Sequence, residues 1–296
     1  LCSPAIKANH QEISQFLWKL KRVQFQLGKI WQDMIPTSKS IRLVTEASNL
    51  FQRCFTLHHQ MNHFVTNLQY YVMLEVLETC WVTLEAKIKA SASIDEVIEA
   101  YEVYLVDIKK RMLLDDNLEV KEGVSIISLI SKMLETIPKF AQLCESFCGA
   151  IDDTKQRREV IRKQQKANEK KVAESAKKTP PVKPWLKSKQ PEVKKTAPKK
   201  SQWGITEEDE RLDAELLEHI REVIEKTYTE VALEYQEAFG EFWQVLSQAT
   251  SGSSSQTLTS LDHSVNVFLR HLVFRMDFNA YFSYLRPSQP GSHLRF

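Results

Sequence analysis

The longest run of this chain without a charged side chain covers residues 54–74. A membrane-spanning helix needs about twenty consecutive, mostly apolar residues. Nine residues of this segment are polar, so it does not have the composition of a membrane span. Local propensity at 70–77, where Tyr, Val and Leu dominate, favours a strand. Because residues 37–122 contain no glycine and no proline, the turns that bound a buried strand are missing, and we predict a helix.

The helix predicted over residues 41–89 has one apolar stripe. Its members recur every three or four residues, which is the spacing of one helical face: Leu50, Cys54, Leu57, Met61, Phe64, Leu68 and Tyr71 or Val72. At 1.5 Å per residue this helix would be about 70 Å long. Around 70–77 the apolar side chains cover most of the helix circumference, so we expect neighbours on several sides. The pattern therefore predicts the central helix of a bundle.

Further apolar stripes predict an all-α fold, an elongated multi-helix bundle. A first helix is expected at 10–34, with Pro36 ending it. Ser93 and Glu96 form a capping box that opens a helix extending to residue 114. Later helices are expected at 118–148, where Pro138 would introduce a kink, from 206 onward, and from 257 to about 279.

Glycine and cysteine usage excludes several classes of protein. The chain has seven scattered glycines, and no two lie close enough to form a phosphate-binding loop, so a P-loop or a Rossmann fingerprint is absent. Five cysteines without a disulfide-like spacing are typical of a reducing compartment. The chain does not begin with Met and has no pattern of a signal peptide, which suggests part of a longer protein.

Charge is strongly segregated along the chain. Residues 154–201 carry a net charge of +13, and the remainder carries −11. Residues 155–175 could continue as a charged helix or fray into solvent, whereas 179–200 have the composition of a disordered Lys/Pro-rich insertion. Such a segment is either a solvated linker or a site for polyanions. The candidate polyanion-binding residues are Lys170, Lys171, Lys177, Lys178, Lys194, Lys195, Lys199 and Lys200.

The expected organisation has four parts. A first helical region spans 1–154, the basic flexible segment 155–201, the helices completing the same domain 202–286, and a disordered tail 287–296. The partner of the basic segment is either an acidic protein tail or, as an alternative function, nucleic acid. Trp185 is the only aromatic residue in the middle of that segment, which argues against sequence-specific reading of bases.

Three small constellations have both a functional and a structural interpretation. His59 and His63 have the spacing of half a metal site, and Cys144 and Cys148 are also four apart, but neither pair has a matching second pair. We therefore favour packed or surface histidines and buried thiols, and predict no metal site. Glu75 and Glu78 are either paired catalytic acids or, as we favour, a solvated or ion-paired stripe.

Several motifs occur in an order that resembles one family. Residues 64–81 read FVTNLQYYVMLEVLETCW, a long and specific run. Shorter motifs are FLWKLKR at 16–22, IEAYEVYL at 98–105 and FRMDFNAY at 274–281, and QWGIT at 202–206 resembles a run of one member of the family. Together these motifs resemble the C-terminal GRIP region of the gamma-tubulin complex component family. The Lys/Pro-rich stretch is longer and more basic than the resemblance leads us to expect.

The resemblance implies an all-helical, non-enzymatic scaffold subunit that binds gamma-tubulin without a cofactor and supports microtubule nucleation. It implies other gamma-tubulin complex components as lateral partners, through a region largely missing from this chain, and acidic tubulin tails as ligands of the basic segment. The implied location is the cytoskeleton, at a centrosome, spindle pole or equivalent microtubule-organising centre. The residues expected to bind gamma-tubulin, or else to form hydrogen bonds across the bundle, are Asn67, Gln69, Tyr70, Tyr71, Asp277, Asn279 and Tyr281.

Overall fold

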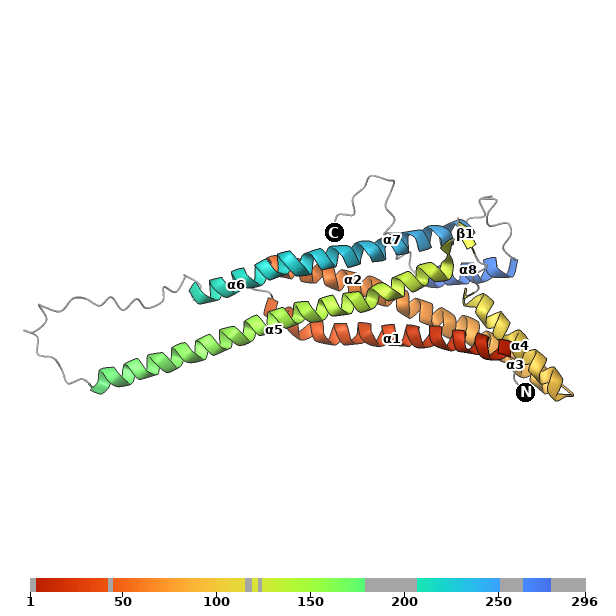
Figure 1. Cartoon of the computed structure of the whole chain (residues 1–296), viewed down its shortest axis with the longest axis horizontal. Coiled ribbons are helices and arrows are strands. Elements are labelled where there is room, and N and C mark those ends of the chain that lie inside the picture. Colours follow the sequence, from red (N-terminus) through yellow and green to blue (C-terminus); the bar gives the residue numbers. More distant parts are fainter. Residues whose placement is uncertain are drawn as a thin grey trace, which may run out of the picture. The chain divides into compact units, whose positions relative to one another are not determined.

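The computed structural model describes residues 4–41, 45–114, 119–121, 124–178, 207–250 and 263–277, and nearly all of these are helical (Figure 1). The helices are α1 (Pro4–Ser40), α2 (Thr45–Tyr70), η2 (Tyr71–Glu78), α3 (Thr79–Ala90), α4 (Ile94–Arg111), α5 (Ile126–Lys178), α6 (Glu207–His219), η4 (Ile220–Ile224), α7 (Glu225–Thr250) and α8 (His263–Met276). A short antiparallel pair of strands, β1 (Glu119–Lys121) and β2 (Val124–Ser125), precedes α5. The all-α prediction is confirmed. The predicted disordered stretches at 179–200 and 287–296 lie outside the described residues.

The long helix predicted at 41–89 is present as the consecutive segments α2, η2 and α3. Its middle segment η2 is a π-helix, which the sequence did not predict. In a π-helix each backbone N–H bonds to the carbonyl five residues earlier, so one turn holds more residues than an α-helical turn. A four-residue repeat of buried side chains therefore stays on one face through this region: Leu68, Val72, Val76, Cys80 and Leu84.

The prediction that Pro36 ends the first helix was wrong. Helix α1 continues through Pro36 to Ser40. Proline removes one backbone donor from a helix, which is the reason for the sequence rule. Side-chain donors serve the carbonyls of this turn: the Thr37 hydroxyl donates to the Asp33 carbonyl at 3.0 Å, and the Ser38 hydroxyl to the Ile35 carbonyl at 2.7 Å.

Helix α5 begins later and ends later than predicted. The region expected to start a helix at 118 instead contains β1 and β2. Ser125 then acts as the cap of α5, since its hydroxyl accepts a hydrogen bond from the Ser128 backbone N–H at 3.2 Å. The helix runs through Pro138 to Lys178, which is the charged-helix alternative for the start of the basic segment.

The described residues pack into two compact units. The first comprises 1–32, 52–144 and 227–296, and the second comprises 33–51 and 145–226. In the first unit the ring of Phe64 lies edge-on to Phe239 and Phe242, which joins α2 to α7. In the second unit Phe51 packs edge-on against Phe147 at 5.6 Å between ring centroids, which joins α2 to α5. Each unit thus has its own apolar core.

The starts of α4 and α6 agree with the sequence, whereas α1 begins at Pro4 rather than at 10, and the predicted start of the last helix at 257 lies outside the described residues. Ser93 caps α4 by accepting from the Glu96 backbone N–H at 3.3 Å, and the Glu96 carboxylate accepts from the Ala92 N–H at 2.8 Å, so the predicted capping box is confirmed. Helix α6 begins at Glu207 with four acidic residues in its first turn. None of the helices in the described ranges combines the length and apolar character required to cross a lipid bilayer.

Candidate partner-binding surface

The motif at 64–81 includes the end of α2, all of η2 and the start of α3, and its neighbours are α4 and α8 (Figure 1). These elements belong to the first unit. A π-helix is frequently found at a functional position, because its wider turn alters which side chains point outward. The candidate residues of this motif therefore divide into those that fix η2 and those that it exposes.

Tyr71 fixes η2 against α4. Its ring is buried, and its hydroxyl donates a hydrogen bond to the Arg111 backbone carbonyl at 2.8 Å. Burial raises the pKa of the Tyr71 phenol, so this hydroxyl stays protonated and remains a donor. Tyr71 consequently holds the bundle together, which was one of the two predicted roles.

Asn67 and Gln69 are only partly buried. The Asn67 amide donates to the His63 backbone carbonyl at 2.9 Å, one turn back on the same helix. Gln69 differs from it, because its carbonyl oxygen Oε1 is buried and has no hydrogen-bond partner among the described residues. A buried acceptor without a donor carries a free-energy cost, so Gln69 does not stabilise the bundle through this atom.

Tyr70 has the opposite environment to Tyr71, since about half of it is exposed (52%). It begins a strip of large apolar side chains on the outer side of η2 and α3. We call this strip the η2–α3 apolar face, and its members are Tyr70, Met73, Leu74, Trp81 and Val82. The sequence analysis selected only Tyr70 from this face. For residues 70–77 it expected neighbours on several sides, and it made no prediction for Trp81 or Val82.

The α3 end of this face continues onto α4, which packs against α3 as a helical hairpin (Figure 1). The Trp81 ring meets Tyr104 edge-on at 6.5 Å between centroids, and Tyr104 stacks on Tyr101 at 5.8 Å. Burial raises the pKa of the Tyr104 phenol. Aromatic side chains of this kind offer large contact areas that lose little conformational entropy on binding.

Helix α8 supports the other side of η2. Arg275 pairs with Glu75 at 3.1 Å, and His271 lies 3.8 Å from the same carboxylate. The Arg111 guanidinium lies 4.6 Å above the centre of the Phe268 ring, a cation–π contact that joins α8 to α4. Glu75 therefore belongs to an ion-paired cluster, as favoured over a catalytic role.

Three candidate residues come from the motif at 274–281. Asp277 follows the end of α8 and is partly buried. The pKa of His63 is lowered by burial and by His59, and the Asp277 charge opposes that lowering, so Asp277 lies near the α2 end of the motif. Asn279 and Tyr281 lie outside the described residues.

Comparison with known proteins decides the family. Residues 1–282 match the family described as "Gamma tubulin complex component C-terminal".

The chain belongs to this family.

Among curated relatives, the family region is 24% identical to "Gamma-tubulin complex component 3 homolog" of Xenopus laevis, over 95% of this chain and 26% of that protein. It is 25% identical to "Gamma-tubulin complex component 3" of Homo sapiens, again over 95% of this chain and 26% of that protein. A shorter match, 35% identical over 42% of this chain and 16% of the relative, is to component 3 of Arabidopsis thaliana. The chain thus spans about a quarter of the length of the first two relatives, and all three of these relatives are component 3 proteins.

Four of the eight predicted polyanion-binding lysines lie on α5. Lys170 and Lys171 are exposed on its basic C-terminal part, and Lys177 and Lys178 occupy its last turn. The other four candidates, Lys194, Lys195, Lys199 and Lys200, lie outside the described residues. The structure therefore describes the basic segment as helix as far as Lys178.

Of the predicted histidine pair, His59 is exposed and His63 is partly buried, with the Asn67 amide 3.2 Å from its ring. The neighbouring His58 is buried, and its Nε2–H donates to the Leu27 carbonyl at 2.9 Å. Cys144 and Cys148 are buried thiols that form no disulfide. In the described part of the chain no three His, Cys, Asp or Glu side chains converge in a way that could hold a metal ion.

Proposed function

We propose that this chain is the gamma-tubulin-binding part of a scaffold subunit of the gamma-tubulin complex, and that it supports microtubule nucleation without catalysing a reaction. The family match over residues 1–282 supports this assignment. Relatives named "Spindle pole body component 98" of Dictyostelium discoideum and "Spindle pole body component alp6" of Schizosaccharomyces pombe support a location at a microtubule-organising centre. Lateral partners are other gamma-tubulin complex components, and any GTP involved is bound by gamma-tubulin.

The observation that carries the proposal is the η2–α3 apolar face. Single exposed apolar residues are common on soluble proteins, but several large ones gathered on neighbouring turns mark a candidate binding surface. This strip contains Tyr and Trp, which are enriched at the centres of protein interfaces. Gamma-tubulin is the partner that the family suggests for this strip.

The surroundings of the strip make it suitable for rigid docking. Tyr71 fastens η2 to α4, and the Glu75–Arg275 pair fastens it to α8. A surface held in place by its neighbours loses little conformational entropy on binding.

Size-exclusion chromatography tests the function directly. The full-length protein that contains this chain is mixed with gamma-tubulin, and a stable 1:1 complex is expected to elute ahead of either component. The competing function predicts a different pattern, with no gamma-tubulin complex but binding to DNA or RNA that weakens steeply with salt. That second pattern would overturn the proposal.

A further inference from the structure

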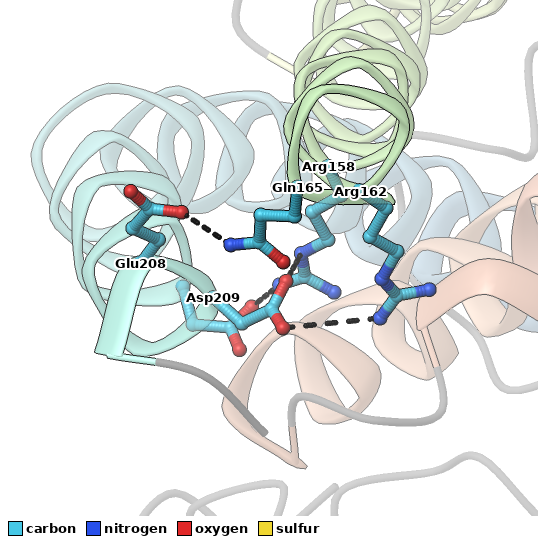
Figure 2. Close-up of polar contacts among 6 residues, drawn as sticks. Arg158, Arg162, Gln165, Glu208 and Asp209 are labelled. Carbon is cyan, nitrogen blue, oxygen red and sulfur yellow. Dashed lines mark hydrogen bonds and ion pairs between the residues drawn. The ribbon is translucent and has the colours of Figure 1, made fainter. Parts of the chain in front are cut away.

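The start of the basic segment binds carboxylates within this chain. Helix α5 faces the first turns of α6, and their side chains form a polar cluster that we call the α5–α6 clasp. Its members are Arg158, Arg162 and Gln165 of α5 with Glu208, Asp209 and Asp213 of α6. Figure 2 shows the α5 side chains pointing toward the α6 carboxylates. Both helices belong to the second unit over these residues.

The contacts of the clasp follow an antiparallel register. Arg158 pairs with Asp213 and lies 4.0 Å from Asp209, and Arg162 lies 3.9 Å from Asp209. Further along α5, the Gln165 amide donates to the Glu208 carboxylate at 2.8 Å (Figure 2). Later residues of α5 therefore meet earlier residues of α6.

The centre of the clasp is shielded from solvent. Only 16% of the Arg158 side chain and 11% of the Asp209 side chain are exposed. Burial lowers the pKa of the Arg158 guanidinium, and the Asp209 charge opposes that lowering, so the two charges depend on each other. An ion pair in this environment is stronger than one on the open surface. The α5 ridge is therefore a formed site for an acidic helix.

The same ridge of α5 continues beyond the clasp. Arg158, Arg162, Lys166 and Lys170 are spaced four residues apart, so they form one row along the helix. Lys163 lies beside this row, three residues before Lys166. Lys163, Lys166 and Lys170 are exposed, and among the described residues none of them forms an ion pair. Figure 1 shows α5 running on past the first turn of α6.

Among the described residues, α6 forms no ion pair with this second half of the row. The Gln165–Glu208 contact sets the antiparallel register, which brings Glu207, the first described residue of α6, level with Lys166 and leaves Lys170 beyond the described part of α6. Exposed cations that form no ion pair attract an external anionic ligand.

We propose that the exposed ridge of Lys163, Lys166 and Lys170 binds an acidic polypeptide segment of a partner protein. The ligand has carboxylates about one helical turn apart, like Asp209 and Asp213, which fill the neighbouring half of the same row. Residues 155–171 contain no aromatic side chain on which a base could stack, so carboxylates fit this ridge better than a nucleic acid. The site is separate from the η2–α3 apolar face and does not depend on gamma-tubulin binding.

Fluorescence anisotropy with the whole chain tests this site. The probe is a labelled oligoglutamate peptide, compared with a labelled single-stranded DNA of equal charge. The variant Lys163→Gln/Lys166→Gln/Lys170→Gln is expected to bind the peptide about tenfold more weakly, because it removes three ion pairs. The matched control, Lys87→Gln/Lys132→Gln/Lys226→Gln, has the same net charge and removes exposed lysines elsewhere.

The result expected is peptide binding that weakens with salt, is retained by the control and is reduced in the ridge variant. Equal affinities of the ridge variant and the control would show that only net charge matters, and would overturn the proposal. Failure of the peptide to bind at low salt, or tighter binding of the DNA than of the peptide, would also overturn it. Circular dichroism of each variant checks that the helical content is unchanged.

Discussion

The hydroxyl of Tyr71 donates a 2.8 Å hydrogen bond to the backbone carbonyl of Arg111, forty residues later in the chain. This bond joins the π-helical segment η2 to the end of α4. The adjacent Tyr70 is exposed on the other side of the same helix. Two neighbouring tyrosines of one motif therefore have different roles: one stabilises the bundle and the other belongs to the candidate binding surface.

Tyr71→Phe is expected to lower the free energy of unfolding by about 1–2 kcal/mol, because the part-buried Arg111 carbonyl loses its donor. Urea denaturation measures this change. Tyr70→Phe is the matched control, since it removes a hydroxyl from an exposed ring and should change stability by less than about 0.5 kcal/mol. Equal losses in both variants would contradict the role given to Tyr71.

Stability is expected to fall in mild acid. Burial lowers the pKa of His58, its hydrogen bond to Leu27 opposes the lowering, and His59 adds to it. The folded-state pKa is thus below the unfolded value of about 6.5, so the unfolded chain binds the proton first as pH falls. The contribution of neutral His58 to the free energy of unfolding is complete above about pH 6.5. Below that pH it decreases by at most about 1.4 kcal/mol per pH unit.

Urea denaturation between about pH 7 and pH 5 measures this decrease, and His58→Gln should make the dependence on pH shallower. His63 continues to contribute in that variant, because burial lowers its pKa as well. An unchanged pH dependence in His58→Gln would show that His58 does not titrate as described.

Breaking the clasp should destabilise the second unit. Arg158→Met leaves the shielded Asp209 with one of its two cations and removes the cation paired with Asp213, and we expect a loss of about 2–3 kcal/mol. Arg157→Met is the control, since Arg157 is largely exposed and lies 3.8 Å from Glu215, and it should cost less than about 0.5 kcal/mol. Hydrogen exchange of α6 amides gives the readout, and equal protection in both variants would refute the clasp.

The cap of α4 can be tested by one substitution. Ser93→Ala removes the acceptor of the Glu96 backbone N–H and should cost about 1 kcal/mol. Ser93→Asp keeps an acceptor at the same position and is expected to restore stability. Thermal denaturation compares the three proteins, and a Ser93→Ala variant as stable as the wild type would show that this end of α4 does not need the cap.

The helical fold could be predicted from periodicity, because burial of one helical face constrains which positions are apolar. Pro36 shows the limit of local rules: α1 continues through it, with side-chain donors on the carbonyls of that turn. The start of α5 was not predicted, because Ser125 caps this helix only where the β1–β2 strand pair ends. The π-helix η2 depends on packing against α4 and α8, which are distant in sequence.

The candidate sites were predicted only in part. Sequence placed Tyr70 and Tyr71 in one motif, but which of them faces solvent depends on how η2 is rotated in the bundle. The exposure of Leu74 was not predicted, because apolar side chains around most of the helix at 70–77 indicated neighbours on several sides. The pairing of the α6 acids with Arg158, about fifty residues earlier, required the structure.

The central claim is that the η2–α3 apolar face binds gamma-tubulin, and the most direct test compares two matched double variants. Biolayer interferometry would measure the affinity of gamma-tubulin for Leu74→Gln/Val82→Gln and for Leu233→Gln/Val160→Gln, which changes similarly exposed residues on α7 and α5. We predict that the first variant binds at least about tenfold more weakly than the wild type and that the second binds equally well. Equal affinity of both variants and the wild type would contradict the account.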